Sequence, residues 1–372
     1  MSARFLTAVS GRAFNMRDRF GREIDYMRIS VIDSCNLNCY YCNPQDNNKK
    51  CQAINILSVK KVLCIVRAAT RLGITHFRLT GGEPLLHPQI DEMVSQIKKI
   101  PGVRSVSLTT NAVLLAQHAK QLKEAGIDSI NVSLDTIDAS EYEHITKKPL
   151  LHKVEQGIDA AIECGIRVKI NVVLTPQSDG GALTLYASKK GQDIRFLDMM
   201  PVGEGHTNGV EPYKKVIGAL LEVYGTPCHI DTENREEINS GYNNADNGPA
   251  EYYSFHGLDI RVGLIQAIHG KFCDTCNRIR VTADGRLMPC LGSSMTMDLV
   301  PDSCEFTDDL EKDFVIVQAL KAAIKAKPGC HNFNDNAVTY TKTTETKTVE
   351  TKATELKAAE VNAARNMSRI GG

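Results

Sequence analysis

Two groups of three cysteines have spacings that suit metal chemistry. The first triad follows the pattern C-x3-C-x2-C and consists of Cys35, Cys39 and Cys42. The second triad follows the pattern C-x2-C-x13-C and consists of Cys273, Cys276 and Cys290. Thiolates are common ligands of iron–sulfur clusters and of structural zinc. Three thiolates on a four-iron cluster leave one iron without a protein ligand, and that iron is open to an exogenous molecule.

The spacing alone leaves other metal sites open. Cys51 is a candidate fourth ligand that would turn the first triad into a zinc site or a closed cluster. His269 could complete a tetrahedral zinc site with the second triad, and Cys304 is a further candidate ligand there. For the second triad, zinc and a second iron–sulfur cluster are equally compatible with the spacing.

Short β-rich runs alternate with longer amphipathic segments between residues 26 and 197, which predicts βαβ units with parallel strands. The predicted strands are Tyr26–Ile32, Thr75–Thr80, Val103–Thr109, Ser129–Leu134, Arg167–Leu174 and Asp193–Leu197. The predicted helices between them include Ser58–Leu72, Gln89–Lys99 and Ala116–Ala125, and Gly73, Gly126 and Gly165 are expected to end helices. Six such units predict an α/β fold, a partial (β/α)6 TIM barrel that places its chemistry after the carboxyl ends of the strands.

Composition excludes several classes of protein. The chain has 372 residues, 42% of them hydrophobic and 24% charged, so bulk disorder is excluded. Lys and Arg number 44, as do Asp and Glu, so no global field attracts nucleic acid or an anionic membrane. No stretch is long and apolar enough for a membrane span or an export signal, which predicts a cytoplasmic protein. Any anion site must be local.

Four regions are expected along the chain. Residues 1–204 hold the partial barrel, and residues 205–338 form a less regular C-terminal region that carries the second triad. Residues 339–366 are a low-complexity linker of Thr, Lys and Glu pentads, and residues 367–372 are a tail ending in Gly371-Gly372. The pentads form no apolar helical face, and we assign them no function.

The segment CNLNCYYC, followed by TGGEP after the second predicted strand, resembles the radical S-adenosylmethionine (SAM) enzymes over residues 20–200. The residue types of TGGEP by themselves indicate that a ligand can approach the backbone closely at the two glycines. The Glu83 carboxylate is a candidate acceptor for an ammonium group. The resemblance implies that SAM binds the open iron of a first [4Fe–4S] cluster and yields a 5′-deoxyadenosyl radical. It also implies a SAM site lined by Tyr41, Gly82, Ser133 and Met200.

The insert NRIR within the second triad places Arg278 and Arg280 at i and i+2, on one side of an extended segment, which suits phosphate oxygens. The whole string FCDTCNRIRVTADGRLMPCL resembles the second cluster motif of the GTP 3′,8-cyclase family of molybdenum cofactor biosynthesis. The resemblance implies a second [4Fe–4S] cluster whose open iron binds guanine. It implies GTP-binding positions at Arg28, Arg78, Thr109, Lys169, Arg278, Ile279 and Arg280, of which Arg28, Arg278 and Arg280 also serve catalysis.

The implied reaction takes hydrogen from C3′ of GTP, joins the ribose radical to C8 and closes 3′,8-cyclo-7,8-dihydro-GTP. The implied partners are GTP, an external electron donor and cyclic pyranopterin monophosphate synthase as the next enzyme, with a homodimer as one candidate assembly and no nucleic acid or membrane. The Gly-Gly tail is implied to enter the barrel. The alternatives are a radical SAM peptide maturase with an auxiliary cluster and a non-catalytic metal-binding protein.

Two features depart from the family pattern. Asn43 stands where the family often has Met, and residues 203–256 match poorly. Five further cysteines have no assigned role, and most are expected to be small buried apolar residues: Cys51, Cys64, Cys164, Cys228 and Cys330.

Overall fold

The computed structural model describes residues 16–42, 54–201, 211–230, 248–293, 295–299, 309–331 and 333. Cys51, Cys304, the pentad repeat and Gly371-Gly372 lie outside the described residues, so the expectations about them stay predictions. The division of the chain into four regions also stays a prediction.

All six predicted strands are present, with ends within two residues of the predicted ones: β1 (Tyr26–Ser30), β2 (His76–Thr80), β3 (Ser105–Thr110), β4 (Ser129–Ser133), β5 (Val168–Val173) and β6 (Asp193–Leu197). They pair in chain order and in parallel. The connecting helices are α1 (Val59–Thr70), α2 (Ile90–Lys98), α3 (Leu115–Glu124), α4 (Ala139–Thr146), α5 (Leu151–Glu163) and α6 (Gly180–Lys189). The glycines expected to end helices, Gly73, Gly126 and Gly165, all have positive φ, which glycine adopts without strain.

The C-terminal region continues the same sheet at both ends. β9 (Val262–Ile265) adds in parallel to β6, and β10 (Arg278–Val281) adds in parallel to β1. The strand order is β12-β11-β10-β1-β2-β3-β4-β5-β6-β9-β8-β7, in which the added strands are β7 (Cys228–Ile230), β8 (Glu251–Ser254), β11 (Arg286–Met288) and β12 (Met297–Asp298). The sequence pattern predicted six parallel strands, and the structure has eight in the described residues. The segment from β9 to β10 runs from one end of this parallel set to the other and carries Cys273 and Cys276.

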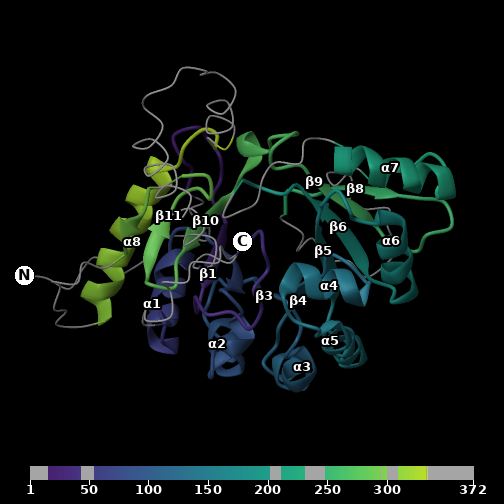
Figure 1. The fold of residues 1–372 in the computed structure, drawn as a ribbon. Helices are drawn as coiled ribbons and strands as arrows, with labels where there is room; N and C mark the ends of the chain where they lie inside the picture. Colours follow the sequence, from purple (N-terminus) through teal and green to yellow (C-terminus); the bar gives the residue numbers. More distant parts are fainter. Residues whose placement is uncertain are drawn as a thin grey trace, which may run out of the picture.

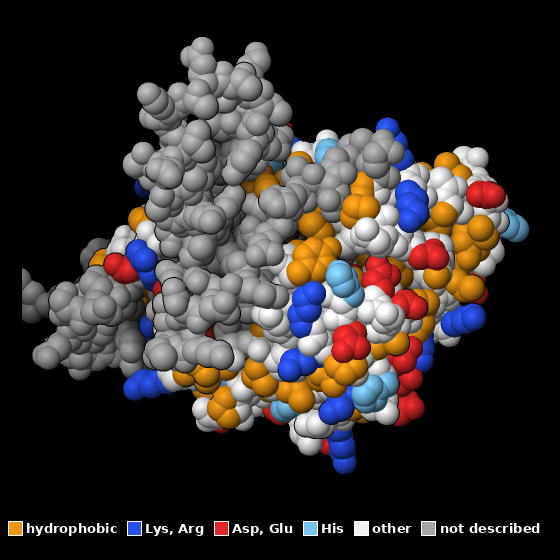
Figure 2. Space-filling model, in the orientation of Figure 1, with side chains coloured by type: hydrophobic (Ala, Val, Ile, Leu, Met, Phe, Trp, Pro, Cys, Tyr) orange, Lys and Arg blue, Asp and Glu red, His pale blue; other side chains and the backbone are white. Residues whose placement is uncertain are grey.

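The helices cover the outside of the curved sheet (Figure 1). α8 (Asp309–Ala326) packs beside α1, and α7 (Glu211–Tyr224) packs beside α6. Among the described residues, no helix is both long and apolar enough to cross a bilayer. On the visible face, basic and acidic side chains are interspersed, in keeping with the zero net charge (Figure 2).

The two faces of the parallel sheet differ in chemistry. Met27 and Ile29 of β1, and Phe77 and Leu79 of β2, are completely buried in the apolar core. The alternate positions on the same strands carry polar side chains, among them Tyr26, Arg28 and Arg78, and these line a cavity. A TIM barrel usually fills its interior with branched apolar residues. Here the pleat of the strands sends the apolar residues outward to the helices and builds a polar interior.

Candidate active site

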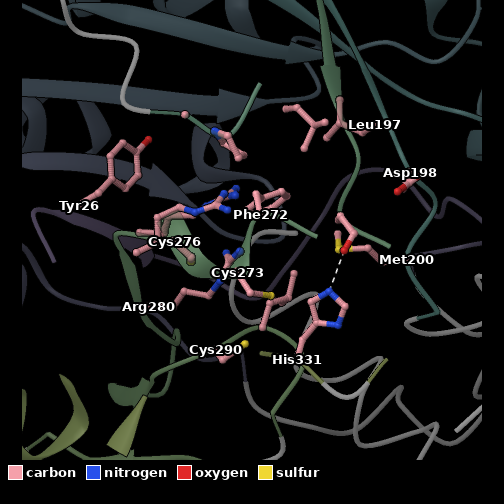
Figure 3. Close-up of a pocket in the computed structure, with 18 of the residues that line it drawn as sticks. Tyr26, Leu197, Asp198, Met200, Phe272, Cys273, Cys276, Arg280, Cys290 and His331 are labelled. Atoms are coloured by element: carbon pink, nitrogen blue, oxygen red, sulfur yellow. Dashed lines mark hydrogen bonds between the residues drawn. The ribbon is translucent and has the colours of Figure 1, made fainter. Parts of the chain in front are cut away.

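The interior cavity and the solvent at its opening together take up roughly 1150 Å³ of space. Its basic lining residues are Arg28, Arg78, Arg195, Arg278, Arg280 and Lys327, whereas Asp198 is its only carboxylate among the described residues. Thr109 and Met200 also line it, as do all three cysteines of the second triad. Figure 3 shows Cys273, Cys276 and Cys290 on one side of the cavity and Leu197, Asp198 and Met200 on the other. Positive charge is therefore concentrated in this cavity although the protein as a whole is neutral, and the cavity can bind an anion.

The register of β1 and β10 separates the two triads along the barrel. Tyr26, the first residue of β1, pairs with Arg278, which follows Cys276 by two residues. The first triad begins at Cys35, beyond the opposite end of β1. A rise of about 3.3 Å per residue makes β1 alone about 13 Å long, so the triads lie at opposite ends of the strand. Arg28 and Arg280 are register partners between those ends.

The first triad lies against the TGGEP turn. The Gly82 amide donates to the Ile32 carbonyl at 2.7 Å, and the Glu83 amide donates to the Ser34 carbonyl at 2.8 Å. A Cβ on Gly82 would lie 2.3 Å from the Ser34 oxygen, which is far inside contact distance. Gly82 therefore permits the cysteine loop to approach the end of β2. This packing role accompanies the cofactor role implied by the family resemblance.

Glu83 is buried and hydrogen-bonded within the protein. Its carboxylate is 1% exposed and accepts hydrogen bonds from the Thr110 hydroxyl (2.7 Å) and the Asn111 amide (2.8 Å). Burial raises the pKa of Glu83 to about 7 despite these bonds. The Asn111 side chain in turn donates to Asn36 Oδ1 at 2.7 Å and approaches Cys35 Sγ at 3.8 Å. Glu83 thus fixes the end of β3 against the cysteine loop, and its role as an acceptor for an ammonium group stays a prediction.

The predicted SAM positions lie at the carboxyl edge of the parallel strands. Gly82 follows β2, Ser133 ends β4 with an exposed side chain, and Met200 follows β6 and lines the cavity. Tyr41, within the first triad, donates its hydroxyl hydrogen to Asp135 just beyond β4. Because that hydrogen is used, the hydroxyl oxygen, the ring and the backbone of Tyr41 remain for a cofactor.

Burial lowers the pKa of arginines in the interior. Burial and repulsion by Arg280 hold the pKa of Arg28 well below its usual range, and burial and Arg278 lower the pKa of Arg280 to about 10. Nη1 of Arg280 and Nη2 of Arg195 are buried without a hydrogen-bond partner among the described residues. Buried donors of this kind are costly unless a ligand satisfies them. The cavity is therefore suited to an anion with several oxygens, such as a triphosphate.

Two predicted GTP-binding positions are not among the residues that line the cavity. Lys169 is 2% exposed on β5, beside the cavity residue Asn131, and burial followed by repulsion from Arg195 lowers its pKa to about 5. Ile279 is 1% exposed and belongs to the apolar core, because it alternates with Arg278 and Arg280 along β10. Only the backbone of Ile279 is left to contact a ligand.

Sequence reasoning missed two basic residues of the cavity. Arg195 lies on β6, where its Nε donates to Asn171 Oδ1 at 2.9 Å. Its position between the apolar residues Ile194 and Phe196 was the available signal, since alternation places it on the interior face. Lys327 follows α8. No sequence signal links it to the second triad, whose nearest cysteine, Cys290, is 37 residues away.

The second triad lies among cations. Burial alone would raise the pKa of the Cys276 thiol, but Arg278 and Lys327 lower it to about 6. Nδ1 of the zinc candidate His269 contacts Asp198 at 3.0 Å, and His269 does not line the cavity with the cysteines. No group of three or more His, Cys, Asp or Glu side chains forms a single-ion site in the described ranges. The thiolates of a four-iron cluster bind different irons and need not converge on one point.

The remaining described cysteines divide into two groups. Cys64 is buried in the core and Cys164 packs against it, as expected from the sequence. Cys228 and Cys330 are exposed, so the expectation of burial is wrong for them. Cys330 is close enough to Cys273 to contribute to raising its pKa, after the larger effect of burial.

Comparison with known proteins places the chain in a family. The model of the Radical SAM superfamily matches residues 29–185, and that of Molybdenum Cofactor Synthesis C matches residues 192–333. A GTP 3′,8-cyclase of Clostridium perfringens (strain SM101 / Type A) is 35% identical over 321 residues, which cover 86% of this chain and 95% of that protein. The chain belongs to the GTP 3′,8-cyclase family of radical SAM enzymes. A GTP 3′,8-cyclase of Listeria monocytogenes serovar 1/2a is 36% identical, covering 85% of this chain and 92% of that protein.

Solved structures support the fold of this GTP 3′,8-cyclase family member. SuiB of Streptococcus suis, solved with bound S-adenosylmethionine, matches with a TM-score of 0.51 at 17% identity, covering 81% of this chain and 68% of that one. The predicted α/β fold of radical SAM type is thereby confirmed. As a radical SAM enzyme, the chain uses a [4Fe–4S] cluster and SAM.

Proposed function

We propose that this chain converts GTP into (8S)-3′,8-cyclo-7,8-dihydroguanosine 5′-triphosphate, the first step of molybdenum cofactor biosynthesis. The observation that carries the proposal is one cavity, lined by six basic side chains, that contains the second triad and reaches the carboxyl edge of the strands. The name of the relatives agrees with an anionic nucleotide in this cavity. A peptide substrate of a maturase would not require such an excess of buried positive charge.

The first triad is the proposed ligand set of the radical-generating cluster. Its three cysteines lie on one short loop. After the larger effect of burial, the Cys42 sulfur contributes to raising the pKa of both Cys35 and Cys39. The Leu37 amide donates to Cys35 Sγ at 3.5 Å, as backbone amides do toward cluster ligands. With SAM bound there, the reduced cluster would supply the electron that cleaves SAM into methionine and a 5′-deoxyadenosyl radical, and that radical would take the hydrogen from C3′ of GTP. Gly82, Tyr41, Ser133 and Met200 are the proposed SAM contacts.

The second triad is the proposed ligand set of a second [4Fe–4S] cluster with one iron open to guanine. Cys273, Cys276 and Cys290 line the cavity together, and Arg278 and Lys327 offset the negative charge of their sulfurs. The thiolate is the form of cysteine that binds metal, and nearby cations favour that form. The same cavity wall therefore offers a base site next to a phosphate site.

The arginines are the proposed triphosphate ligands. Guanidinium groups bind phosphate oxygens in a fork geometry, and Arg195 and Arg280 each hold a buried nitrogen without a partner. Arg28, Arg78 and Arg278 line the same cavity, with Thr109 as a hydroxyl donor. Held at several points, the nucleotide loses rotational freedom, so C3′ and C8 stay oriented for ring closure. Fixed cations would also stabilise charge that develops during closure.

Anaerobic turnover tests the proposal. Reconstituted protein is incubated with GTP, SAM and a chemical reductant, and nucleotides are identified by mass spectrometry. The expected products are 5′-deoxyadenosine and 3′,8-cyclo-7,8-dihydro-GTP, with none from ATP or from the Cys35→Ala variant. Deoxyadenosine formed without any cyclised nucleotide would refute the substrate and retain the radical chemistry.

Iron and sulfide analysis tests the cofactors separately. Two four-iron clusters require about eight irons per chain. Cys330→Ser is expected to keep all of them, because Cys330 is not a proposed ligand, whereas Cys276→Ala is expected to lose half. Zinc in place of iron at the second triad would contradict this part. The electron donor, the next enzyme in the pathway, a homodimer and the cytoplasmic location remain part of the proposal.

A further inference from the structure

Lys327 is a buried ammonium group beside the second triad. It directly follows α8 and is 2% exposed. Its Nζ donates to the Arg278 carbonyl at 2.9 Å, the Pro289 carbonyl at 3.0 Å and Cys276 Sγ at 3.4 Å. An ammonium has three N–H groups, and each has an acceptor here. All three acceptors belong to the second triad or to residues within two positions of it.

The charge of Lys327 requires an anion nearby. A buried ammonium without a counter-charge is costly, and carbonyl oxygens supply only dipoles. The cavity's described carboxylate, Asp198, is bound to His269 and the Ile268 amide instead. The other Arg and Lys side chains that line the cavity with Lys327 in the described part of the chain, Arg278 and Arg280 among them, are cations. Of the three acceptors, the Cys276 sulfur alone can ionise, and the thiolate is the form that binds iron.

The surroundings of the first triad have the opposite sign. The Glu83 carboxylate accepts from the amide of Asn111, whose side chain approaches Cys35 Sγ at 3.8 Å, and the Asp135 carboxylate accepts from Tyr41, the neighbour of Cys42. An iron–sulfur cluster gains negative charge when it is reduced. Its reduction potential is therefore lowered by nearby carboxylates and raised by nearby cations and by hydrogen bonds to its sulfurs.

We propose that Lys327 is a positioning residue of the second cluster, which raises that cluster's reduction potential through a charged N–H···S hydrogen bond to its ligand Cys276. The inference rests on the proposed second cluster. Lys327 also joins the end of α8 to the cysteine loop and so limits movement of Cys276.

A second cation holds the same segment, so Lys327 can be replaced without releasing it. Arg22 donates to the Pro328 carbonyl at 2.6 Å, the Gly329 carbonyl at 3.0 Å and the Cys273 carbonyl at 2.6 Å. Asp18 holds the Arg22 guanidinium in a buried ion pair at 2.6 Å. The segment after α8 is therefore expected to keep its place in variants without the ammonium.

Electrochemistry of the second cluster alone tests the proposal. The parent is the full chain with Cys35, Cys39 and Cys42 replaced by Ala, reconstituted with iron and sulfide and titrated with a reductant while the reduced cluster is followed by electron paramagnetic resonance. Lys327→Met and Lys327→Gln remove the charge, and Lys325→Met removes an exposed charge from the last turn of the same helix. The expected result is full iron content throughout, a lower potential in both Lys327 variants and no change in the control.

The outcomes separate the two proposals. A parent that binds no iron refutes the second cluster itself, and with it that part of the proposed function. Lys327 variants with full iron and the parent's potential overturn the role of Lys327 and leave the cluster in place. If Lys327→Met loses iron, Lys327→Gln decides: retained iron with a lower potential supports the proposal. If both variants lose iron while the parent retains it, the role of Lys327 is purely structural, and the proposed effect on the reduction potential is overturned.

Discussion

Arg28 of β1 and Arg280 of β10 are register partners on two hydrogen-bonded parallel strands, so two cavity-lining guanidinium groups are neighbours in the interior. Arg280 is 7% exposed, and burial together with Arg278 lowers its pKa to about 10. Two adjacent cations, Arg280 buried and Arg28 half-buried, destabilise the free protein and favour an anion. The fold stores this repulsion at the site where a triphosphate is proposed to bind.

Replacing Arg280 with Met is therefore expected to stabilise the free protein and to abolish GTP binding. The lowered pKa corresponds to at most about 3 kcal/mol at 1.36 kcal/mol per pKa unit. A gain of about 1 kcal/mol would already raise the melting temperature by roughly 2–4 °C. Thermal unfolding with and without GTP measures both effects. The control is Arg286→Met on β11, which breaks only an exposed ion pair with Asp298. A destabilised Arg280→Met protein would contradict the argument.

Lys169 is expected to make stability pH-dependent. Its pKa is about 5 in the folded protein, against about 10.4 for an unperturbed lysine. Between these values the unfolded chain binds one more proton than the folded chain, so stability from this group rises as the pH rises from about 5 to 10. Lys169→Met should flatten the pH dependence of the free energy of unfolding in this range. Chemical denaturation at several pH values measures it, and an unchanged slope would count against the burial effect.

The same lysine is expected to take up a proton when GTP binds. A polyanion near Lys169 favours its charged form and raises its pKa. At pH 7, titration calorimetry in buffers with different ionisation enthalpies should show proton uptake on GTP binding, with one proton per GTP as the upper limit for a single lysine. Lys169→Met provides the control, because it retains protonation changes of the nucleotide itself. Equal uptake in both proteins would remove Lys169 from the GTP site.

Arg195→Met is expected to weaken GTP binding by about 10- to 100-fold, since hydrogen bonds to charged groups contribute about 1.5–3 kcal/mol. Arg195 lines the cavity, and its buried Nη2 lacks a partner. Arg104→Met is the matched control, because Arg104 is exposed next to β3 and outside the cavity. Equilibrium binding of GTP, measured at several salt concentrations, gives the dissociation constants. Similar affinities for both variants would exclude a contact between Arg195 and the nucleotide.

Gly82→Ala is expected to disrupt the first triad and spare the second. The new Cβ would meet the Ser34 carbonyl at 2.3 Å, so the cysteine loop must move. Iron content should fall from about eight to about four per chain, with loss of SAM cleavage. Gly218→Ala in α7 is the control, since nothing lies within 4 Å of its added Cβ and alanine favours a helix. Full iron content in Gly82→Ala would show that the close approach is dispensable.

Local pattern predicted the six strands of the barrel well, because alternation and helix-ending glycines depend on near neighbours in the chain. β9 and β10 were not predicted as strands of the same sheet. Val262–Ile265 and Arg278–Val281 are each only four residues long, and their pairing with β6 and β1 is a long-range contact. Short strands of this kind are stabilised by their partners rather than by their own sequence.

The sequence by itself determined the chemistry available to this protein: two cysteine triads, a Gly-Gly turn and arginines at alternate positions of an extended segment. Spacing fixes which ligands share a loop, so these features could be read without a structure. Only the tertiary structure decided that Arg195 and Lys327 join the same cavity and that the triads stand at opposite ends of β1. These relationships arise from strand register and from the end of α8, which bring residues hundreds of positions apart into contact through packing that no local pattern encodes.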